Sequence, residues 1–529
     1  MPKILVLDGL SEEGVAVFRD EGFDVDVKPP QKPDELAAII GDYDGLVVRS
    51  ATKVTAEVFE HCGNLKVIGR AGVGTDNIDK DAATQKGVVV MNTPGGNTIS
   101  TCEHAFALMF ALLRNVPTAN QSMQEGRWDR KKFMGTEVCG KTIGIVGMGR
   151  IGGAVAKRAQ SFEMKVIAFD PILTELKADA LGVELVSMDE LIERSDIITI
   201  HAPKSDKTNN MIRMEQLKKM KPSCRIINCA RGGIVNEQDL AQALKEGVIA
   251  GAALDVYTSE PFENNPFVGL DNIVTTPHLA ASTDEAQLSV AVDVAKQMAA
   301  YLKTGAIINA VNVPSMDSEL RASIQPQLYL ADRLGLFMAG FMKGRPQSME
   351  IAYAGDIGVA DTYPITTAII SGFLKPSVEC VNMVSAPVQL KERGINVSEK
   401  HVAAPSNYAF DFGVTVVTDE ETHTVKGTLF HGVDPRICSI DDMRVDAQPE
   451  GDMLITMNED KPLIIGRVCT HIGNAGVNIA NLMLGRDARG GRALTVLNLD
   501  QPLSEEVLEA CRQVPYVNEA RLVSLPPAE

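Results

Sequence analysis

The stretch Gly147-Met148-Gly149-Arg150-Ile151-Gly152 decides how this chain folds. It follows a short apolar run, 141–146, that is typical of a buried strand, and it opens a segment, 151–162, with Ala and Val at helical spacing. A second apolar run, 164–169, ends on Asp170. Strand, Gly-rich turn, helix, strand and acid, in that order, predict a Rossmann-like lobe that binds a dinucleotide.

Each glycine of this turn has its own task in such a lobe. Gly147 permits the tight turn, Gly149 lets the backbone approach a pyrophosphate, and Gly152 lets helix and strand pack closely. The helix N-terminus then offers free N–H groups to the phosphates. Asp170 is placed to bond a ribose diol and to repel a 2′-phosphate, so we expect NAD rather than NADP. The alternative is an ordinary Gly-rich turn.

The composition is that of a globular protein of 529 residues, which is long enough for three or four domains. A formal net charge of −18 argues against nucleic acid or an anionic membrane as the main partner. Nine dispersed cysteines without a CxxC pair indicate reduced thiols, no metal site and a cytoplasmic location. The N-terminus turns acidic at Asp8, too early for a signal peptide, and no uncharged run is long enough to cross a bilayer.

Residues 3–95 alternate strand and helix patterns, which predicts a second parallel sheet. Gly72-Val73-Gly74 follows one of its strands without the third glycine of the fingerprint, so this lobe is the natural place for a substrate. The helical pattern 283–302 is expected to return to this lobe. The expected strands are 3–8, 23–27, 45–49, 66–70 and 87–91, and the expected helices include 33–41 and 56–62.

Two segments between the lobes each allow two interpretations. The run 92–97, rich in Pro and Gly, lies before a helix expected at 102–113 and capped by Ser100, and is either a hinge or a plain loop. The run 127–132 contains the only tryptophan and a basic cluster in an acidic protein. It is either a solvated charge run or an arm that reaches an anionic substrate, including one bound across a dimer.

The rest of the chain divides at about residue 313. Further strands of the dinucleotide lobe are expected at 196–201, 225–229, 251–256 and 272–276. Residues 313–450 mix strand and helix signals without a catalytic cluster. Residues 454–525 follow the pattern β-α-β-β-α-β, with Gly490-Gly491 at the hairpin turn, and this predicts a small ferredoxin-like sandwich.

Three side chains that follow strands of the dinucleotide lobe suit the oxidation of an alcohol. His278 can take the hydroxyl proton, and Glu260 can accept the Nδ1 proton and fix the tautomer. Arg231 offers a planar fork to the carboxylate of a 2-hydroxy acid. Each residue also has an ordinary interpretation, as a core histidine, a loop acid and a surface arginine.

Further motifs accompany the fingerprint: Gly69-Arg70-Ala71-Gly72-Val73-Gly74, Asn228-Cys229-Ala230-Arg231-Gly232-Gly233, Ala253-Leu254-Asp255-Val256, Glu260-Pro261 and Pro277-His278-Leu279. Together they resemble the D-2-hydroxyacid dehydrogenase family over essentially the whole length. The run 48–55 is specific to the long-form branch that acts on 3-phospho-D-glycerate.

This resemblance implies roles for individual residues. The catalytic residues would be Arg231, Glu260 and His278. Cofactor contacts would fall on Val73, Gly147, Gly149, Arg150, Ile151, Gly152, Asp170, Ala202, Cys229, Asp255, His278 and Ala281. Substrate contacts would fall on Arg49, Val73, Gly74, Asn97 and Arg231, and we expect Arg49, with help from the cluster 130–132, to hold the substrate phosphate.

The resemblance also implies an α/β architecture of two doubly wound parallel-sheet lobes. The expected domains are a flavodoxin-like substrate lobe (1–96 and 283–312), a Rossmann-like NAD lobe (97–282), an α+β intervening domain (313–451) and a ferredoxin-like ACT domain (452–529). The implied reaction is the NAD-dependent oxidation of 3-phospho-D-glycerate to 3-phosphooxypyruvate, the first step of L-serine biosynthesis. The implied assembly is a homotetramer.

An ACT domain beside an intervening domain implies feedback by serine. The effector would bind between two ACT units, on Asn458, Asp460 and Asn478. The alternative is that Asp460 and Asn478 are ordinary turn residues. The Pro-Gly usual at the start of the first ACT helix is here Pro462-Leu463.

Two other functions remain open. One is a reductase of glyoxylate, hydroxypyruvate or another small 2-oxo acid, which the long C-terminal extension and the basic residues available for a phosphate argue against. The other is an NAD-sensing, corepressor-like binding protein, which the acidic charge and the ACT unit argue against.

Overall fold

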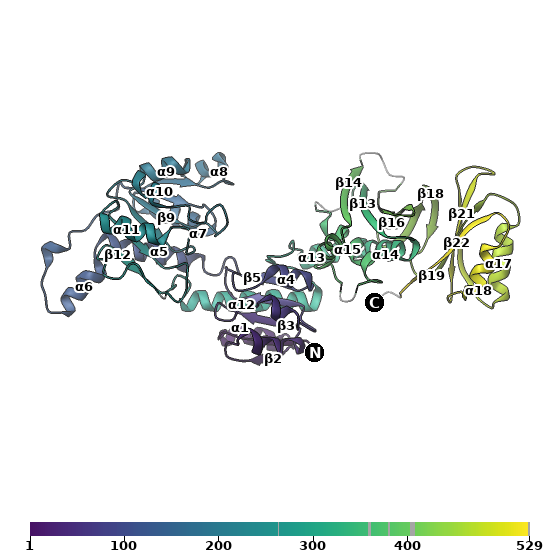
Figure 1. Cartoon of the computed structure of the whole chain (residues 1–529), viewed down its shortest axis with the longest axis horizontal. Coiled ribbons are helices and arrows are strands. Elements are labelled where there is room, and N and C mark those ends of the chain that lie inside the picture. Colours follow the sequence, from purple (N-terminus) through teal and green to yellow (C-terminus); the bar gives the residue numbers. More distant parts are fainter. Residues whose placement is uncertain (263, 358–360, 379–380, 403–407, 527–529) are drawn as a thin grey trace.

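The computed structural model describes residues 1–262, 264–357, 361–378, 381–402 and 408–526. Its described strands form four sheets, arranged along an elongated molecule (Figure 1). The lobe that holds the Gly-rich turn lies at one end and the C-terminal sheet lies at the other. The N-terminal lobe stands between the Gly-rich lobe and the C-terminal half.

The N-terminal sheet is parallel, with the order β2-β1-β3-β4-β5 of a flavodoxin-like fold. One face packs against α12 (Asp284–Thr304), which buries Val294 and Met298 on β4 and lies beside α1. The strands are β1 (Lys3–Val6), β2 (Asp24–Val27), β3 (Gly45–Val48), β4 (Val67–Arg70) and β5 (Val89–Asn92), and the helices are α1 (Glu12–Asp20), α2 (Pro33–Ala37), η1 (Ile40–Asp42), α3 (Ala56–Phe59) and α4 (Lys80–Gln85).

The second sheet is also parallel, with the order β12-β11-β10-β9-β6-β7-β8. The strand order reverses between β6 and β9, and ligands of such sheets bind at that switch point. Its strands are β6 (Thr142–Val146), β7 (Lys165–Phe169), β8 (Glu184–Leu185), β9 (Ile197–Ile200), β10 (Arg225–Asn228), β11 (Gly251–Leu254) and β12 (Ile273–Thr275). Its helices are α5 (Thr98–Leu113), α6 (Val116–Gln124), η2 (Arg130–Lys132), α7 (Arg150–Ser161), α8 (Glu175–Ala180), α9 (Met188–Arg194), α10 (Met214–Lys219) and α11 (Glu237–Glu246).

The third sheet is mixed, with the order β14-β13-β15-β16-β17-β18, and α14 (Gln325–Phe341) packs against it and against α15. Its strands are β13 (Pro346–Gly355), β14 (Asn396–Val402), β15 (Phe410–Thr418), β16 (Thr422–Phe430), β17 (Asp434–Ile440) and β18 (Met443–Ala447). The other helices of this part are α13 (Ser318–Ser323), α15 (Tyr363–Leu374) and α16 (Ala386–Glu392).

The fourth sheet is antiparallel, with the ferredoxin-like order β20-β21-β19-β22. One face packs against the third part, and Val496 and Val523 share a core with α14. The other face is covered by α17 and α18 around Leu454 and Leu497. The elements are β19 (Gly451–Glu459), α17 (Ile464–Asn474), β20 (Ile479–Arg486), β21 (Arg492–Leu499), α18 (Glu505–Arg512) and β22 (Val517–Leu525).

The predicted fold class is confirmed, but two helix starts were wrongly placed. Helix α5 begins at Thr98 with Asn97 as its N-cap residue, so Ser100 lies inside the helix and donates to the Asn97 carbonyl. Helix α17 begins at Ile464, and Leu463 before it has a φ of 72°, a left-handed conformation that suits glycine better. Within the described part of the chain, none of the helices combines the length and apolarity needed to span a membrane.

Candidate active site

The Gly-rich turn between β6 and α7 leaves room for a ligand at one of its three glycines. Gly147 has a φ of 92°, and a Cβ there would lie 2.7 Å from the His201 carbonyl oxygen. A Cβ on Gly152 would lie 2.0 Å from the Gly147 oxygen, so helix and turn pack at backbone contact. Around Gly149 no described atom lies within 4 Å of a Cβ. This open space beside a helix N-terminus suits a pyrophosphate.

The Asp170 carboxylate accepts hydrogen bonds from backbone amides of the Gly-rich turn and of the segment that follows β7. Its Oδ2 accepts from the Met148 amide at 2.8 Å, and its Oδ1 accepts from the Ile172 and Leu173 amides at 2.8 and 3.1 Å. Burial would raise the pKa of this carboxyl, but the three amide bonds outweigh it and hold the pKa below its usual value. Asp170 therefore carries its negative charge at the place where a ribose would lie, and it also fixes the shape of the turn.

A cleft of about 420 Å³ runs between the two lobes at the switch point. Half of the predicted cofactor residues line it: Val73, Ile151, Ala202, Cys229, His278 and Ala281, together with Gly74, Asn97 and Arg231. The cleft walls do not include Gly147, Gly149, Arg150, Gly152, Asp170 or Asp255. The three glycines lie in the Gly-rich turn, and Asp170 is hydrogen-bonded to it. The Arg150 guanidinium lies close to Gly95.

Asp255 lies beneath the cleft, fully buried. Its Oδ1 accepts from the Thr276 hydroxyl at 2.6 Å and from the Leu279 amide at 2.7 Å, and its Oδ2 accepts from the Ala280 amide at 2.9 Å. His104 on α5 adds its Nε2, 3.2 Å from Asp255 Oδ1 and 3.1 Å from Thr276 Oγ1. This network fixes the loop that carries His278, and the sequence analysis missed His104 and Thr276.

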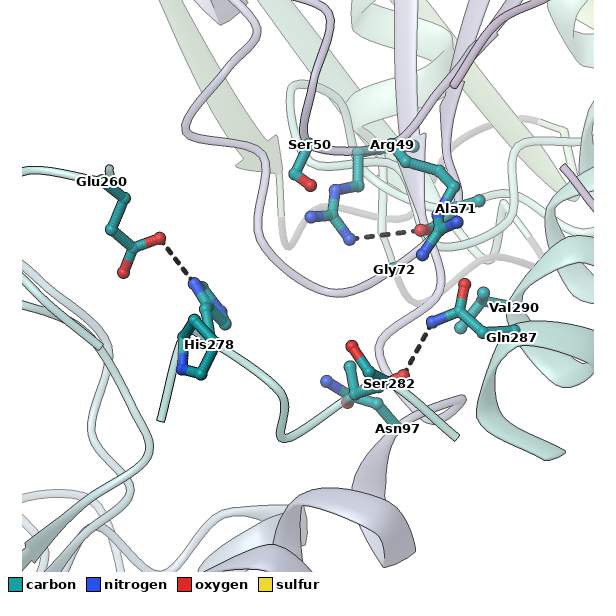
Figure 2. A pocket seen from close by; sticks show the side chains of 13 residues that line it. Arg49, Ser50, Ala71, Gly72, Asn97, Glu260, His278, Ser282, Gln287 and Val290 are labelled. Carbon is teal, nitrogen blue, oxygen red and sulfur yellow. Dashed lines mark hydrogen bonds and ion pairs between the residues drawn. The ribbon is translucent and has the colours of Figure 1, made fainter. Parts of the chain in front are cut away.

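His278 and Glu260 form the predicted acid–base pair (Figure 2). His278 Nδ1 lies 2.7 Å from Glu260 Oε2, while Glu260 Oε1 accepts from the Tyr257 amide at 3.0 Å. The bond to Glu260 raises the pKa of His278 against the opposing effect of burial. Because Nδ1 is bound to the carboxylate, Nε2 is the nitrogen able to exchange a proton with a substrate.

Arg231 lies in the loop after β10, and its side chain contacts the N-terminal lobe. Its Nε lies 3.3 Å from Asp76 Oδ2, and a Cβ on Gly74 would lie 2.3 Å from its Nη2. Asp76 is largely exposed, so this ion pair is weak and a substrate carboxylate can replace it. Arg231 also lowers the pKa of His278 slightly, against the larger effect of Glu260. The charge of Arg231 therefore lies close to the acid–base pair.

A second cavity, of about 300 Å³, opens between the lobes beside His278 (Figure 2). Arg49, Asn97, Glu260 and His278 line it, and Figure 2 shows the His278–Glu260 pair across the opening from Arg49. Gln287, at the start of α12, closes the cavity and donates to the Ala281 carbonyl at 2.7 Å.

Arg70, at the end of β4, is a further cation of this cavity that the sequence analysis did not select. A Cβ on Gly72 would lie 1.5 Å from its Nη1, so only glycine leaves space for this guanidinium. Burial, together with the nearby charges of Arg231 and Arg49, lowers the pKa of Arg70 to about 10. Its Nε is buried without a hydrogen-bond partner among the described residues. Two guanidinium groups in this small cavity, with Arg231 in the adjoining cleft, favour a ligand with more than one negative charge.

Comparisons with known proteins agree with this geometry. Residues 106–280 match the model of the D-isomer specific 2-hydroxyacid dehydrogenase NAD binding domain, and residues 323–441 match the D-3-phosphoglycerate dehydrogenase intervening domain. The chain is 43% identical to D-3-phosphoglycerate dehydrogenase of Archaeoglobus fulgidus over 99% of its length and 100% of the relative. It is 41% identical to the enzyme of the same name from Methanocaldococcus jannaschii, again over 99% and 100%.

The chain belongs to the D-3-phosphoglycerate dehydrogenase family. Among solved structures, a glyoxylate reductase from Paecilomyes thermophila covers 59% of this chain and 98% of its own, with 27% identity and a TM-score of 0.55. The second lobe is thus an NAD-binding domain of a 2-hydroxyacid dehydrogenase, and the open space at Gly149 and the carboxylate of Asp170 fit NAD.

Two other groups of predicted residues, the basic segment around η2 and the effector residues, line neither of these two cavities. The basic segment η2 and Trp128 are exposed and line neither cavity, and Arg127 pairs with Glu125 and Asp129 of its own segment. Within the described residues, no group of His, Cys, Asp and Glu side chains could hold a metal ion.

The predicted effector residues lie at the two ends of the fourth sheet. Asp460 Oδ2 accepts from Arg486 Nη1 at 2.9 Å and from the Gly490 amide at 2.8 Å. Asn478, before β20, donates to Asp500 at 2.7 Å. Asn458 is buried and donates to the Glu459 carbonyl.

Strand register gives the separation of these effector residues. Asn458 pairs with Ala493 and so with Arg486, whereas Ile479, next to Asn478, pairs with Leu499 and so with Asp452. The six residue steps from 452 to 458 span about 20 Å of strand. One chain therefore does not bring Asp460 and Asn478 together.

Proposed function

We propose that this chain oxidises the 2-hydroxyl of 3-phospho-D-glycerate to give 3-phosphooxypyruvate, with NAD as the oxidant, and so begins L-serine biosynthesis. The observation that carries the proposal is the cavity in which the His278–Glu260 pair faces Arg49 and Arg70. A substrate with a carboxylate at one end and a phosphate at the other matches cations on both sides of a central acid–base pair. The full-length relatives are named D-3-phosphoglycerate dehydrogenase, which supports the same substrate.

The residues have distinct tasks in the proposed reaction. Arg231 holds the substrate carboxylate in place of Asp76, and Arg49 and Arg70 hold the phosphate. His278 Nε2 takes the hydroxyl proton, while Glu260 stabilises the resulting imidazolium through Nδ1. The adjoining cleft would hold NAD, which would supply the acceptor for the hydride from C2. His104 and Asp255 keep the His278 loop in place and do not touch the substrate.

Steady-state turnover tests this proposal directly. We expect 3-phospho-D-glycerate to be oxidised with a higher kcat/KM than D-glycerate, D-lactate or glycolate, with NAD preferred to NADP. Equal rates on the phosphorylated and unphosphorylated acids would contradict the substrate assignment. Binding of NAD without turnover of any 2-hydroxy acid would instead favour a corepressor-like binding role.

Regulation by serine and assembly into a homotetramer belong to the same proposal. The positions of Asp460 and Asn478 at opposite ends of one sheet support a composite site in which two ACT units each supply one of them. A carboxylate and an amide from different chains would bind the amino and carboxylate groups of serine. The domain boundaries given above, and a cytoplasmic location, are part of this proposal.

A further inference from the structure

The loop after β3 carries Arg49 to the substrate cavity, and its backbone is bound to the two loops beside it. Strands β1, β3 and β4 are neighbours in the N-terminal sheet, so the loops that follow them meet at one edge. Arg49 and Ser50 line the cavity from the middle loop (Figure 2). The direction of the Arg49 guanidinium therefore depends on what holds this loop.

Asp8, in the loop after β1, binds the Arg49 loop from one side. Its Oδ2 accepts from the Arg49 amide at 2.8 Å and from the Thr52 amide at 3.0 Å. Its Oδ1 accepts from the Thr52 hydroxyl at 2.5 Å, and Thr52 is fully buried. One carboxylate thus satisfies three donors of a four-residue segment and fixes both of its ends.

The backbone of Asp8 shows that this side chain is needed. Asp8 has a φ of 63°, a left-handed conformation that glycine adopts more readily. An aspartate at such a position persists when the surrounding contacts hold it there. Asp8 lines neither the substrate cavity nor the cofactor cleft, so it acts on a ligand through the loop that it holds. Its charge still lies near the second phosphate cation, because it raises the pKa of Arg70 against the larger effect of burial.

Asn77, in the loop after β4, binds the Arg49 loop from the other side. Its Nδ2 donates to the Arg49 carbonyl at 2.8 Å and to the Thr52 carbonyl at 2.7 Å. Its own carbonyl accepts from the Val54 amide at 2.8 Å. Asn77 directly follows Asp76, which pairs with Arg231. One short segment therefore contacts both the cation proposed for the phosphate and the cation proposed for the carboxylate.

We infer that Asp8 and Asn77 are positioning residues that hold the loop after β3 so that Arg49 faces the cavity, and that the preference of the active site for a phosphorylated acid depends on them. The inference rests on the proposed function, because it assigns the phosphate to Arg49. A fixed guanidinium binds a phosphate more tightly than a mobile one, since less conformational freedom is lost on binding. The reacting end of the substrate, at His278 and Arg231, is held by other loops.

Steady-state kinetics on two substrates test the inference. Asp8→Ala and Asn77→Ala should each raise the KM for 3-phospho-D-glycerate by about threefold to tenfold. The KM for D-glycerate and the kcat for either acid should change much less. Asp20→Ala, an exposed acid at the end of α1 in the same lobe, is the matched control and should leave all of these values unchanged.

Two further variants separate the shape of the loop from the charge of Asp8. In Asp8→Asn, the amide oxygen can accept from both backbone amides and the amide nitrogen can donate to the Thr52 hydroxyl. This variant should therefore keep a KM near that of the wild type. Thr52→Val removes only the hydroxyl and should give a smaller rise in KM than Asp8→Ala. Thermal unfolding of each variant shows whether the lobe is still folded.

A double-mutant cycle shows whether Asp8 acts through Arg49. In the Arg49→Met background, Asp8→Ala should cause no further rise in the KM for 3-phospho-D-glycerate. Additive effects would overturn the inference, and so would equal rises in KM for the phosphorylated and unphosphorylated acids. A wild-type preference for the phosphorylated acid that persists in Asp8→Ala and Asn77→Ala would overturn this inference alone. A wild-type enzyme without that preference would overturn the proposed function and this inference with it.

Discussion

The proposed catalytic residues and the proposed effector residues are arranged differently within a single chain. Arg231, Glu260 and His278 come from loops after different strands of one parallel sheet, and the structure brings them to one edge. Asp460 and Asn478 come from one antiparallel sheet, and its register places them at opposite ends. Loops that follow parallel strands meet at one edge of the sheet. Asp460, in contrast, follows the carboxyl end of β19 and Asn478 precedes the amino end of β20, and these two strands run in the same direction because both are antiparallel to β21. A catalytic site can thus be complete in one chain, while the effector site proposed here needs two.

The largest expected effect comes from removing the acid–base. His278→Ala should lower kcat by roughly 10²–10⁴, the usual range for a positioned acid or base, with NAD affinity largely kept. Steady-state kinetics and NADH titration measure the two quantities. His61→Ala, an exposed histidine of the N-terminal lobe, is the control. A His278→Ala enzyme with near wild-type turnover would remove His278 from the mechanism.

The next effect tests the phosphate cations. Arg70→Met and Arg49→Met should each raise the KM for 3-phospho-D-glycerate by about tenfold to a hundredfold, because each loses a charge-assisted hydrogen bond. The KM for unphosphorylated D-glycerate should change much less. Equal changes for both substrates would show that these arginines support the fold of the cavity and do not bind the phosphate.

Removing the carboxylate beside His278 should change the pH profile as well as the rate. Oxidation needs neutral His278, so kcat/KM should rise with pH through a pKa that Glu260 holds above the usual value. Without the carboxylate this pKa falls, so in Glu260→Gln the rise should move to lower pH, with a reduced plateau. In the reverse reduction, which needs protonated His278, the loss of activity at high pH should move in the same direction. An unshifted profile would break the link between the pair and the reaction.

Cofactor choice is the next, smaller effect. Asp170→Ala should weaken NAD binding and narrow the preference for NAD over NADP, because the charge that repels a 2′-phosphate is gone. The loss of three amide bonds will also loosen the turn, so the ratio of the two cofactors is the informative quantity. Asp179→Ala, an exposed acid on α8, is the control. An unchanged ratio would exclude Asp170 as the source of discrimination.

The smallest effect on uninhibited turnover is expected at the fourth sheet. Asp460→Ala should abolish inhibition by serine and leave the rate without serine nearly intact, and Asn478→Ala should do the same. Asp487→Ala, another exposed acid of the same hairpin region paired with an arginine, is the control. Mixed oligomers of the two single variants sharpen the test, since composite sites would be restored in part. Calorimetry that detects no serine binding to the intact protein would refute the effector proposal.

The sequence predicted most strands of the two parallel sheets and the pattern of the fourth sheet because their signals are local, but it gave no strands for the third sheet. The Gly-rich turn, the apolar runs and the hairpin glycines each act over a few residues. It missed contacts whose partners are distant along the chain, such as His104 with Asp255. It also missed Arg70, whose direction depends on the space that Gly72 leaves. The start of α5 was misplaced because Ser100 resembles a cap, although its hydroxyl bonds back to Asn97 from within the helix.

The path of the chain through the N-terminal lobe affects how the protein is made. The sheet β1–β5 is complete by Asn92, yet α12, which covers one of its faces, ends only at Thr304. During synthesis, that face stays uncovered until the whole NAD lobe has been translated, because Val294 and Met298 pack against it only then. A nascent chain stalled before residue 284 therefore exposes an apolar sheet face, and such a fragment should engage chaperones or aggregate. The N-terminal lobe therefore becomes a stable unit only when α12 has been synthesised, and not when the first sheet is complete.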